Sequence, residues 1–124
     1  MPGLNAIGIV SADLSRTRAF YGLLGVEIAE GDDHVEAQFP NGLRLMFDTE
    51  DVMRSFSPDW TRVTGTTVSL AFECGSPAEV DDLYGRVVAA GFHGEMEPWD
   101  AFWGQRYAEL HDPDGTLVHL FAAL

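Results

Sequence analysis

The chain contains the same short pattern twice, and this repeat limits the folds that it can adopt. Each copy begins with an apolar run, continues with a helix-start signal and a helical apolar stripe, and ends its helix at a glycine. The copies align without a gap at a constant offset, which pairs Ile9 with Phe72 and Tyr21 with Tyr84. A chain built from two similar halves commonly places its binding site where the halves meet, so the repeat also guides the search for function.

The elements of each half follow the same order. In the first half we expect a strand over 4–10, a helix that starts after Ser11-Ala12-Asp13 and ends at Gly25, and strands over 26–29, 34–39 and 43–48. In the second half we expect a strand over 67–72, a helix that starts at Ser76-Pro77 and ends at Gly91, and strands over 93–97, 105–111 and 116–122. Tight turns are predicted at Pro40-Asn41-Gly42 and Asp112-Pro113-Asp114-Gly115.

Each half therefore reads βαβββ, which predicts an α+β fold of two modules with curved, mixed sheets around a cleft. We interpret the chain as one domain, with modules over about 1–54 and 66–124 and a polar linker over 55–65. On the strands, alternation places Leu43, Leu45 and Phe47 opposite Arg44, Met46 and Asp48. It likewise places Leu117, His119 and Phe121 opposite Val118 and Leu120.

The charge balance excludes some partners. With 7 Lys and Arg against 20 Asp and Glu, the net charge is -13, so nucleic-acid backbones would be repelled. The single Cys74 cannot form an internal disulfide, and no basic-then-apolar leader or membrane segment is evident near the N-terminus. We therefore expect a cytoplasmic protein without a nucleic-acid or membrane partner.

Two runs carry a family resemblance: "LNAIGIVSADLSRTRAFYGLLGVEI" near the start and "WGQRYAELHDPDGTLVHLFA" near the end. Together with the repeat, they resemble the vicinal oxygen chelate superfamily, and the second run is most similar to bleomycin resistance proteins. The resemblance implies the paired-module fold. It does not choose an activity, because the superfamily includes metal enzymes such as glyoxalase I, extradiol dioxygenases and fosfomycin-inactivating thiol transferases, and also metal-free proteins that sequester an antibiotic.

The resemblance also implies four metal-ligand positions, normally occupied by His and Glu. Counting from the motifs, these positions fall at Ala6, Met46, Ser69 and His119, so only His119 supplies a suitable donor. We therefore expect no metal cofactor. A small error in the count would leave Asp48, Glu109 and His119 as an alternative metal set. His34, His93 and His111 stand in polar surroundings and read as surface residues, and Cys74 reads as a structural thiol.

Aromatic residues form the second unusual feature. Trp99, Phe102, Trp103 and Tyr107 lie close together, where Pro98 and Gly104 favour a loop that leads into a strand, and Phe56 and Trp60 lie in the predicted linker. These rings either line a ligand site or cover sheet ends and a dimer contact. The predicted ligand-binding residues are Met46, Asp48, Phe56, Trp60, Trp99, Phe102, Trp103, Tyr107, Glu109 and His119.

The sequence thus predicts a metal-free, homodimeric protein that sequesters an aromatic antibiotic or natural product, with no catalytic residue. The acidic charge and the aromatic faces would favour a cationic group on that ligand. One alternative is a metal-dependent enzyme of the glyoxalase or dioxygenase type. Another is an orphan domain without a ligand, or a metal-free enzyme in which His119 or Glu109 acts as a general base.

Overall fold

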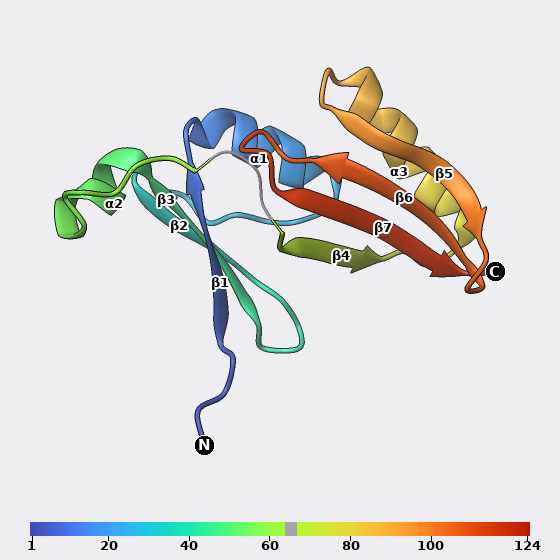
Figure 1. The fold of residues 1–124 in the computed structure, drawn as a ribbon, viewed down its shortest axis with the longest axis horizontal. Coiled ribbons are helices and arrows are strands. Elements are labelled where there is room, and N and C mark those ends of the chain that lie inside the picture. The colour runs from blue at the N-terminus through green and yellow to red at the C-terminus, as the bar shows by residue number, and fades with distance from the viewer. Residues whose placement is uncertain (64–66) are drawn as a thin grey trace. The chain divides into compact units, whose positions relative to one another are not determined.

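The computed structural model describes residues 1–63 and 67–124, which form two compact units, Met1–Arg62 and Val63–Leu124 (Figure 1). The N-terminal unit contains β1 (Ala6–Ser11), α1 (Leu14–Leu23), β2 (His34–Gln38), β3 (Arg44–Thr49) and α2 (Glu50–Phe56). The C-terminal unit contains β4 (Ser69–Glu73), α3 (Pro77–Ala89), β5 (Gly94–Ala101), β6 (Gln105–His111) and β7 (Leu117–Ala123). This α+β architecture with two small mixed sheets confirms the predicted fold class. Within the described ranges, no helix combines the length and the apolar character that crossing a membrane requires.

The N-terminal sheet has the strand order β1-β3-β2, with β1 parallel and β2 antiparallel to β3. The predicted start of α1 is confirmed: the Asp13 carboxylate accepts hydrogen bonds from the backbone N–H groups of Ser15 and Arg16. The buried ring of Tyr21 packs on Phe47 of β3, with 5.2 Å between ring centroids. This contact ties the helix to the core side of the sheet.

One strand prediction for the N-terminal unit is wrong. Residues 26–29 form no strand, because a single backbone hydrogen bond, from Ala29 N–H to the Glu36 carbonyl, joins this segment to β2. The predicted linker begins inside a helix, since α2 runs to Phe56 and Thr49 caps it by accepting from Val52 N–H. Part of that linker, 64–65, lies outside the described residues.

The C-terminal sheet has the strand order β4-β7-β6-β5, and α3 packs on β5, β6 and β7 (Figure 1). As predicted, the Ser76 hydroxyl caps α3, accepting from Glu79 N–H, and Pro77 stands in the first turn. β5 is longer than predicted: Trp99 lies in the strand rather than in a loop and pairs with Tyr107. Two register shifts between Gly94 and Trp99 interrupt its ladder with β6.

The predicted alternation is confirmed in both units. In β3, Leu45 and Phe47 are buried whereas Met46 is partly exposed. In β6 and β7, alternate residues are buried on the side of α3, and the others lie on the opposite side. We call this second side the face opposite α3. It carries Trp99 of β5, Tyr107, Glu109 and His111 of β6, and Leu117, His119 and Phe121 of β7.

Candidate functional site

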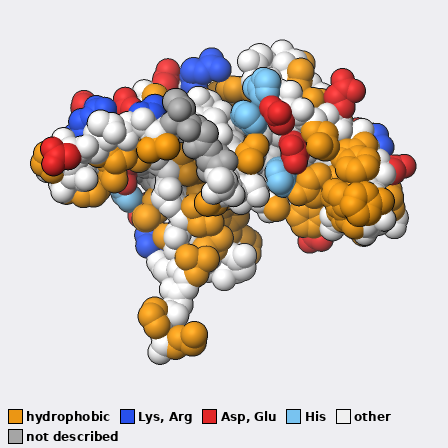
Figure 2. All heavy atoms as spheres, in the orientation of Figure 1, with side chains coloured by type: hydrophobic (Ala, Val, Ile, Leu, Met, Phe, Trp, Pro, Cys, Tyr) orange, Lys and Arg blue, Asp and Glu red, His pale blue; other side chains and the backbone are white. Residues whose placement is uncertain are grey.

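A connected series of aromatic rings begins at the turn between β5 and β6. Trp103 makes edge-to-face contacts with Phe102, Tyr107 and Trp99 at centroid distances of 5.0, 5.2 and 5.5 Å. Tyr107 in turn contacts the ring of His119 at 5.2 Å. Phe102 is 90% exposed and Trp103 48%. Figure 2 shows hydrophobic side chains gathered at this end of the unit, with histidines and carboxylates farther along it. We call Trp99, Phe102, Trp103 and Tyr107 the ring cluster.

His119 lies at the inner end of this series. Its Nδ1 hydrogen-bonds to the Tyr107 hydroxyl, and its Nε2 lies 3.4 Å from Glu109 Oε1. Burial, and then the nearby Glu109 charge, raises the pKa of Tyr107, so its hydroxyl stays protonated. In the tautomer in which this hydroxyl donates to Nδ1, the imidazole proton lies on Nε2, on the side of the Glu109 carboxylate. The longer contact does not have hydrogen-bond geometry, so the buried Nε2 lacks a hydrogen-bond partner among the described residues.

The register of each sheet shows which side chains lie level with Met46 and His119, the two predicted metal positions on β3 and β7. His119 pairs with Ala71 on one side and Glu109 on the other, and Met96 pairs with Glu109. This row of the C-terminal sheet therefore offers two donor side chains, His119 and Glu109. Ala71, not the predicted Ser69, is level with His119.

The corresponding row of the N-terminal sheet contains Gly8, Met46 and Glu36. Gly8 is level with Met46, and the predicted Ala6 lies two residues earlier on β1, level with Arg44. Glu36 is already bonded to Arg44 and His34, at 2.8 and 2.7 Å. The superfamily's four-ligand pattern therefore does not fit these two rows, although the absence of a metal cofactor remains a prediction.

Asp48, the third member of the alternative metal set, belongs to the N-terminal unit. Its carboxylate bonds His34 Nδ1 at 2.6 Å, while the other ring nitrogen of His34 bonds Glu36. Hydrogen bonds to both carboxylates, the one from Glu36 first, raise the pKa of His34. His34 and Glu36 also border an open depression of about 670 Å³, beside residues 27–30. Asp48 is therefore engaged in an ion-pair network of its own unit.

The other aromatic candidates also lie in the N-terminal unit. Phe56 is exposed at the end of α2. Trp60 is partly exposed, and the guanidinium groups of Arg54 and Arg62 lie over it, at 5.2 and 5.7 Å from its ring centroid. Trp60 therefore makes its aromatic contacts with arginines of its own unit, through cation–π interactions. The structure thus brings together Trp99, Phe102, Trp103, Tyr107, Glu109 and His119 of the predicted site, whereas Met46, Asp48, Phe56 and Trp60 belong to the other unit.

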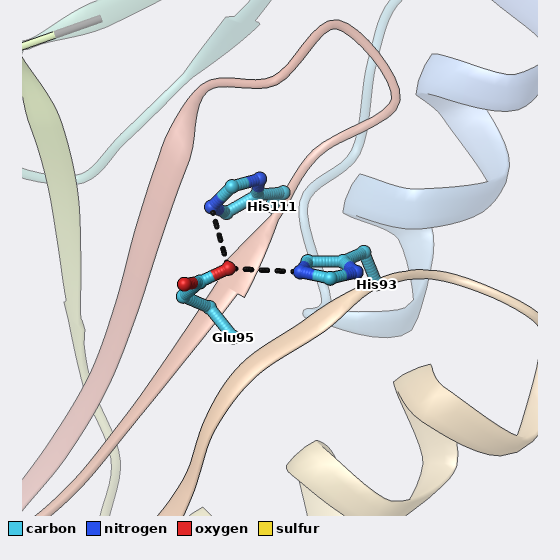
Figure 3. A group of neighbouring side chains, drawn as sticks. All are labelled: His93, Glu95 and His111. Atoms are coloured by element: carbon cyan, nitrogen blue, oxygen red, sulfur yellow. Dashed lines mark hydrogen bonds and ion pairs between the residues drawn. The ribbon is translucent and has the colours of Figure 1, made fainter. Parts of the chain in front are cut away.

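Sequence reasoning missed a second group of side chains. His93 and His111 were both interpreted as surface residues in polar surroundings, but their rings converge on the Glu95 carboxylate (Figure 3). His93 Nε2 lies 2.8 Å and His111 Nε2 3.3 Å from Glu95 Oε2. The spacing of His93 and Glu95, two apart on a strand, was the available signal, because alternation places such residues on one face.

The arrangement on the face opposite α3 suits binding through stacking and hydrogen bonding. The exposed rings offer flat apolar surfaces, and His119 with Glu109 offers a polar end. Tyr107, His119 and Glu109 could also relay a proton, since they lie in contact in that order.

Comparisons with known proteins agree with the fold of the chain. Residues 3–120 match the model of the glyoxalase/bleomycin resistance protein/dioxygenase superfamily. A superfamily protein from Nocardioides is 26% identical, with a TM-score of 0.77, over 100% of this chain and 85% of that one. A family enzyme from Burkholderia phytofirmans PsJN is 18% identical, with a TM-score of 0.86, over 99% and 100% of the two chains.

A glyoxalase-related enzyme from Fulvimarina pelagi is 21% identical, with a TM-score of 0.86, over 98% of this chain and 88% of that one. A search of curated proteins finds no match. The likenesses below 25% identity support the fold, whereas the family model covers almost the whole chain. The chain therefore belongs to the glyoxalase/bleomycin resistance protein/dioxygenase superfamily.

Proposed function

We propose that the protein binds a small aromatic molecule at the ring cluster and sequesters it unchanged, in the manner of the antibiotic-binding members of its superfamily. The observation that carries this proposal is the series of touching rings that runs from the exposed Phe102 to His119. A planar ligand stacked on Trp103 would cover apolar surface that otherwise faces water.

Unsatisfied polar atoms support a ligand at the same place. The indole N–H of Trp99 and the Nε2 of His119 are buried and lack hydrogen-bond partners among the described residues. Leaving a buried polar group unpaired costs about 1–3 kcal/mol, so a ligand with an acceptor near either atom would gain by pairing it. By contrast, the Trp103 indole N–H is satisfied, because it donates to Gln105 Oε1 at 2.7 Å. The Trp103 ring is therefore held in place while 48% of the residue stays exposed to solvent.

Charge favours a cationic group on the ligand. Glu109 is mostly buried beside the ring cluster, with 23% of its side chain exposed, and the whole chain carries a net charge of -13. A cation would be attracted by this field and by the aromatic faces. Protection by sequestration needs no chemical reaction, because the concentration of free ligand falls once the protein concentration exceeds the dissociation constant. We retain a homodimer as part of the proposal, since exposed rings also suit a subunit contact.

A metal-dependent glyoxalase or dioxygenase-type enzyme is the second candidate. His119 favours it, because its Nε2 is a buried nitrogen without a hydrogen-bond partner among the described residues and lies beside a carboxylate. A metal-dependent enzyme would require further metal-binding side chains besides His119 and Glu109, because two protein ligands do not hold a catalytic ion. Metal binding that disappears in His119→Gln would support this candidate over sequestration.

The test is a fluorescence titration with metal-free bleomycin and a panel of other aromatic, cationic antibiotics. It uses a Trp60→Phe background, which leaves Trp99 and Trp103 as the reporters. We expect saturable quenching, with unchanged ligand recovered afterwards. Trp103→Ala should weaken binding by about 2 kcal/mol, or roughly 30-fold, as expected for a central aromatic contact.

Phe56→Ala is the matched control, because it also removes an exposed ring, but from the N-terminal unit. It should leave the affinity unchanged. Equal losses of ligand affinity in Trp103→Ala and Phe56→Ala would contradict a site at the ring cluster. Conversion of the ligand into a product would replace sequestration with catalysis.

A further inference from the structure

The group of His93, Glu95 and His111 is independent of the ring cluster and of the proposed sequestration. It lies at the other end of β6, where His111 is two residues beyond Glu109 on the same face. Three potential metal donors meet there: one ring nitrogen from each histidine and one carboxylate oxygen, all within 4.8 Å of one another.

The backbone fixes the two histidines opposite each other. The His111 N–H donates to the His93 carbonyl at 3.1 Å, which joins the start of β5 to the end of β6. The rings then lie side by side, with their centroids 4.8 Å apart, and both turn toward Glu95 (Figure 3). A pair held by a cross-strand hydrogen bond needs little further ordering to bind an ion.

Gly94 determines the direction of its two neighbours. A Cβ atom at Gly94 would clash with the Tyr84 hydroxyl and lie 2.9 Å from Val88 Cγ2, so the glycine backbone packs directly on α3. Alternation then directs His93 and Glu95 away from the helix, onto the face that carries His111. The same close packing that requires a glycine therefore places two of the three donors together.

The distances from the Glu95 oxygen to the two ring nitrogens are close to those that a small tetrahedral cation requires. Zinc binds histidine nitrogen and carboxylate oxygen at about 2.0–2.2 Å, which places neighbouring donors roughly 3.3 Å apart. Here Glu95 Oε2 lies 2.8 Å from His93 Nε2 and 3.3 Å from His111 Nε2. The side chains of His93 and Glu95 are 60% and 44% exposed, so an ion can enter without opening the core and can keep water on its remaining position.

We propose that His93, Glu95 and His111 form a binding site for a divalent transition metal ion, Zn²⁺ in particular. The site has two imidazole ligands and one carboxylate ligand, a set that suits zinc and nickel better than magnesium or calcium. It shares no residue with the row that contains Met46 or with the row that contains His119.

The experiment is a calorimetric titration of the chelator-stripped full chain with ZnCl₂, with MgCl₂ as the negative control. We expect one Zn²⁺ per chain with a dissociation constant of about 10 μM or tighter, and no heat with Mg²⁺. His93→Gln and His111→Gln should each weaken zinc binding by at least about 10-fold, because each removes one of three ligands. Circular dichroism of each variant checks that the fold is retained.

Two further histidines serve as matched controls. His34→Gln alters an exposed histidine that also lies between carboxylates, and His119→Gln alters the superfamily position; both should leave zinc binding unchanged. Imidazole NMR signals of His93 and His111 alone should shift on zinc addition. The absence of zinc binding, or its loss in His119→Gln with its retention in His111→Gln, would overturn the proposal.

Discussion

At the scale of single residues, Gly94 shows how packing and a candidate site depend on one missing side chain. Its φ does not require glycine, so the constraint is space alone: the Tyr84 ring and Val88 occupy the position of a Cβ. We predict that Gly94→Ala lowers the free energy of unfolding by about 1–3 kcal/mol, the usual cost of overpacking. Thermal and urea unfolding measure this change.

Gly85→Ala is the control for this prediction, because Gly85 lies in α3, the helix on which Gly94 packs, and a Cβ atom there would meet no atom within 4 Å. Alanine at this position should stabilise the helix by about 0.5–1 kcal/mol. If Gly94→Ala proved as stable as the wild type, the close packing of β5 on α3 would be disproved. A stable Gly94→Ala would also remove the steric reason for the direction of His93 and Glu95.

At the scale of elements, β2 and β3 are joined by side chains as well as by their ladder. His34 and Glu36 of β2 bond Asp48 and Arg44 of β3. The bonds raise the pKa of His34 above 6.5, and hydrogen bonds from His34 and then Arg44 lower the pKa of Glu36 below 4.5. The raised pKa stabilises the fold below pH 6.5, and this contribution is lost as the pH rises through the folded-state pKa.

For Glu36 the sign is opposite: its contribution is present above pH 4.5 and is lost as the pH falls through its folded-state pKa. The pair therefore stabilises the unit most between about pH 4.5 and 6.5. We predict that Glu36→Gln lowers the pKa of His34, as measured by NMR titration of the imidazole. Asp59→Asn, which neutralises an exposed carboxylate beyond the end of α2, should leave it unchanged. An unshifted His34 titration in Glu36→Gln would contradict the contacts drawn between these strands.

Elements with strong local signals could be predicted from the sequence. The cap residues Asp13 and Ser76 and the alternation around Met46 and His119 are local properties of the chain, and the structure confirms them. Residues 26–29 have an apolar strand pattern but form one bond to β2, because strand formation depends on a partner that the local pattern does not specify.

The two candidate sites also differ in how far the sequence alone could predict them. The ring cluster was predictable because Trp99, Phe102 and Trp103 are close in sequence and precede a strand. The meeting of His93 with His111 was not, because it depends on how β5 pairs with β6, and the place of Glu95 beside them depends on the shift between Gly94 and Met96. Counting residues cannot locate a β-bulge, so a donor group built across one appears only in the folded chain.

At the scale of the whole molecule, the net charge of -13 separates two contributions to ligand binding. Stacking on the ring cluster is short-ranged and apolar, so salt should leave it unchanged or strengthen it slightly. Attraction of a cation by the whole chain is long-ranged, and salt screens it: the Debye length falls from about 10 Å at 0.1 M to about 3 Å at 1 M.

We therefore predict that the association rate of a cationic aromatic ligand falls by roughly 10-fold or more between low salt and about 1 M NaCl. A neutral aromatic ligand of similar size should associate at nearly the same rate throughout. Stopped-flow quenching of Trp99 and Trp103 in the Trp60→Phe background measures both rates at each salt concentration. Similar salt responses for the two ligands would mean that the acidity of the chain does not contribute to ligand capture. A decrease in association rate for the cationic ligand alone would mean that the net negative charge of the chain selects cationic ligands, whereas stacking on the ring cluster holds both ligands.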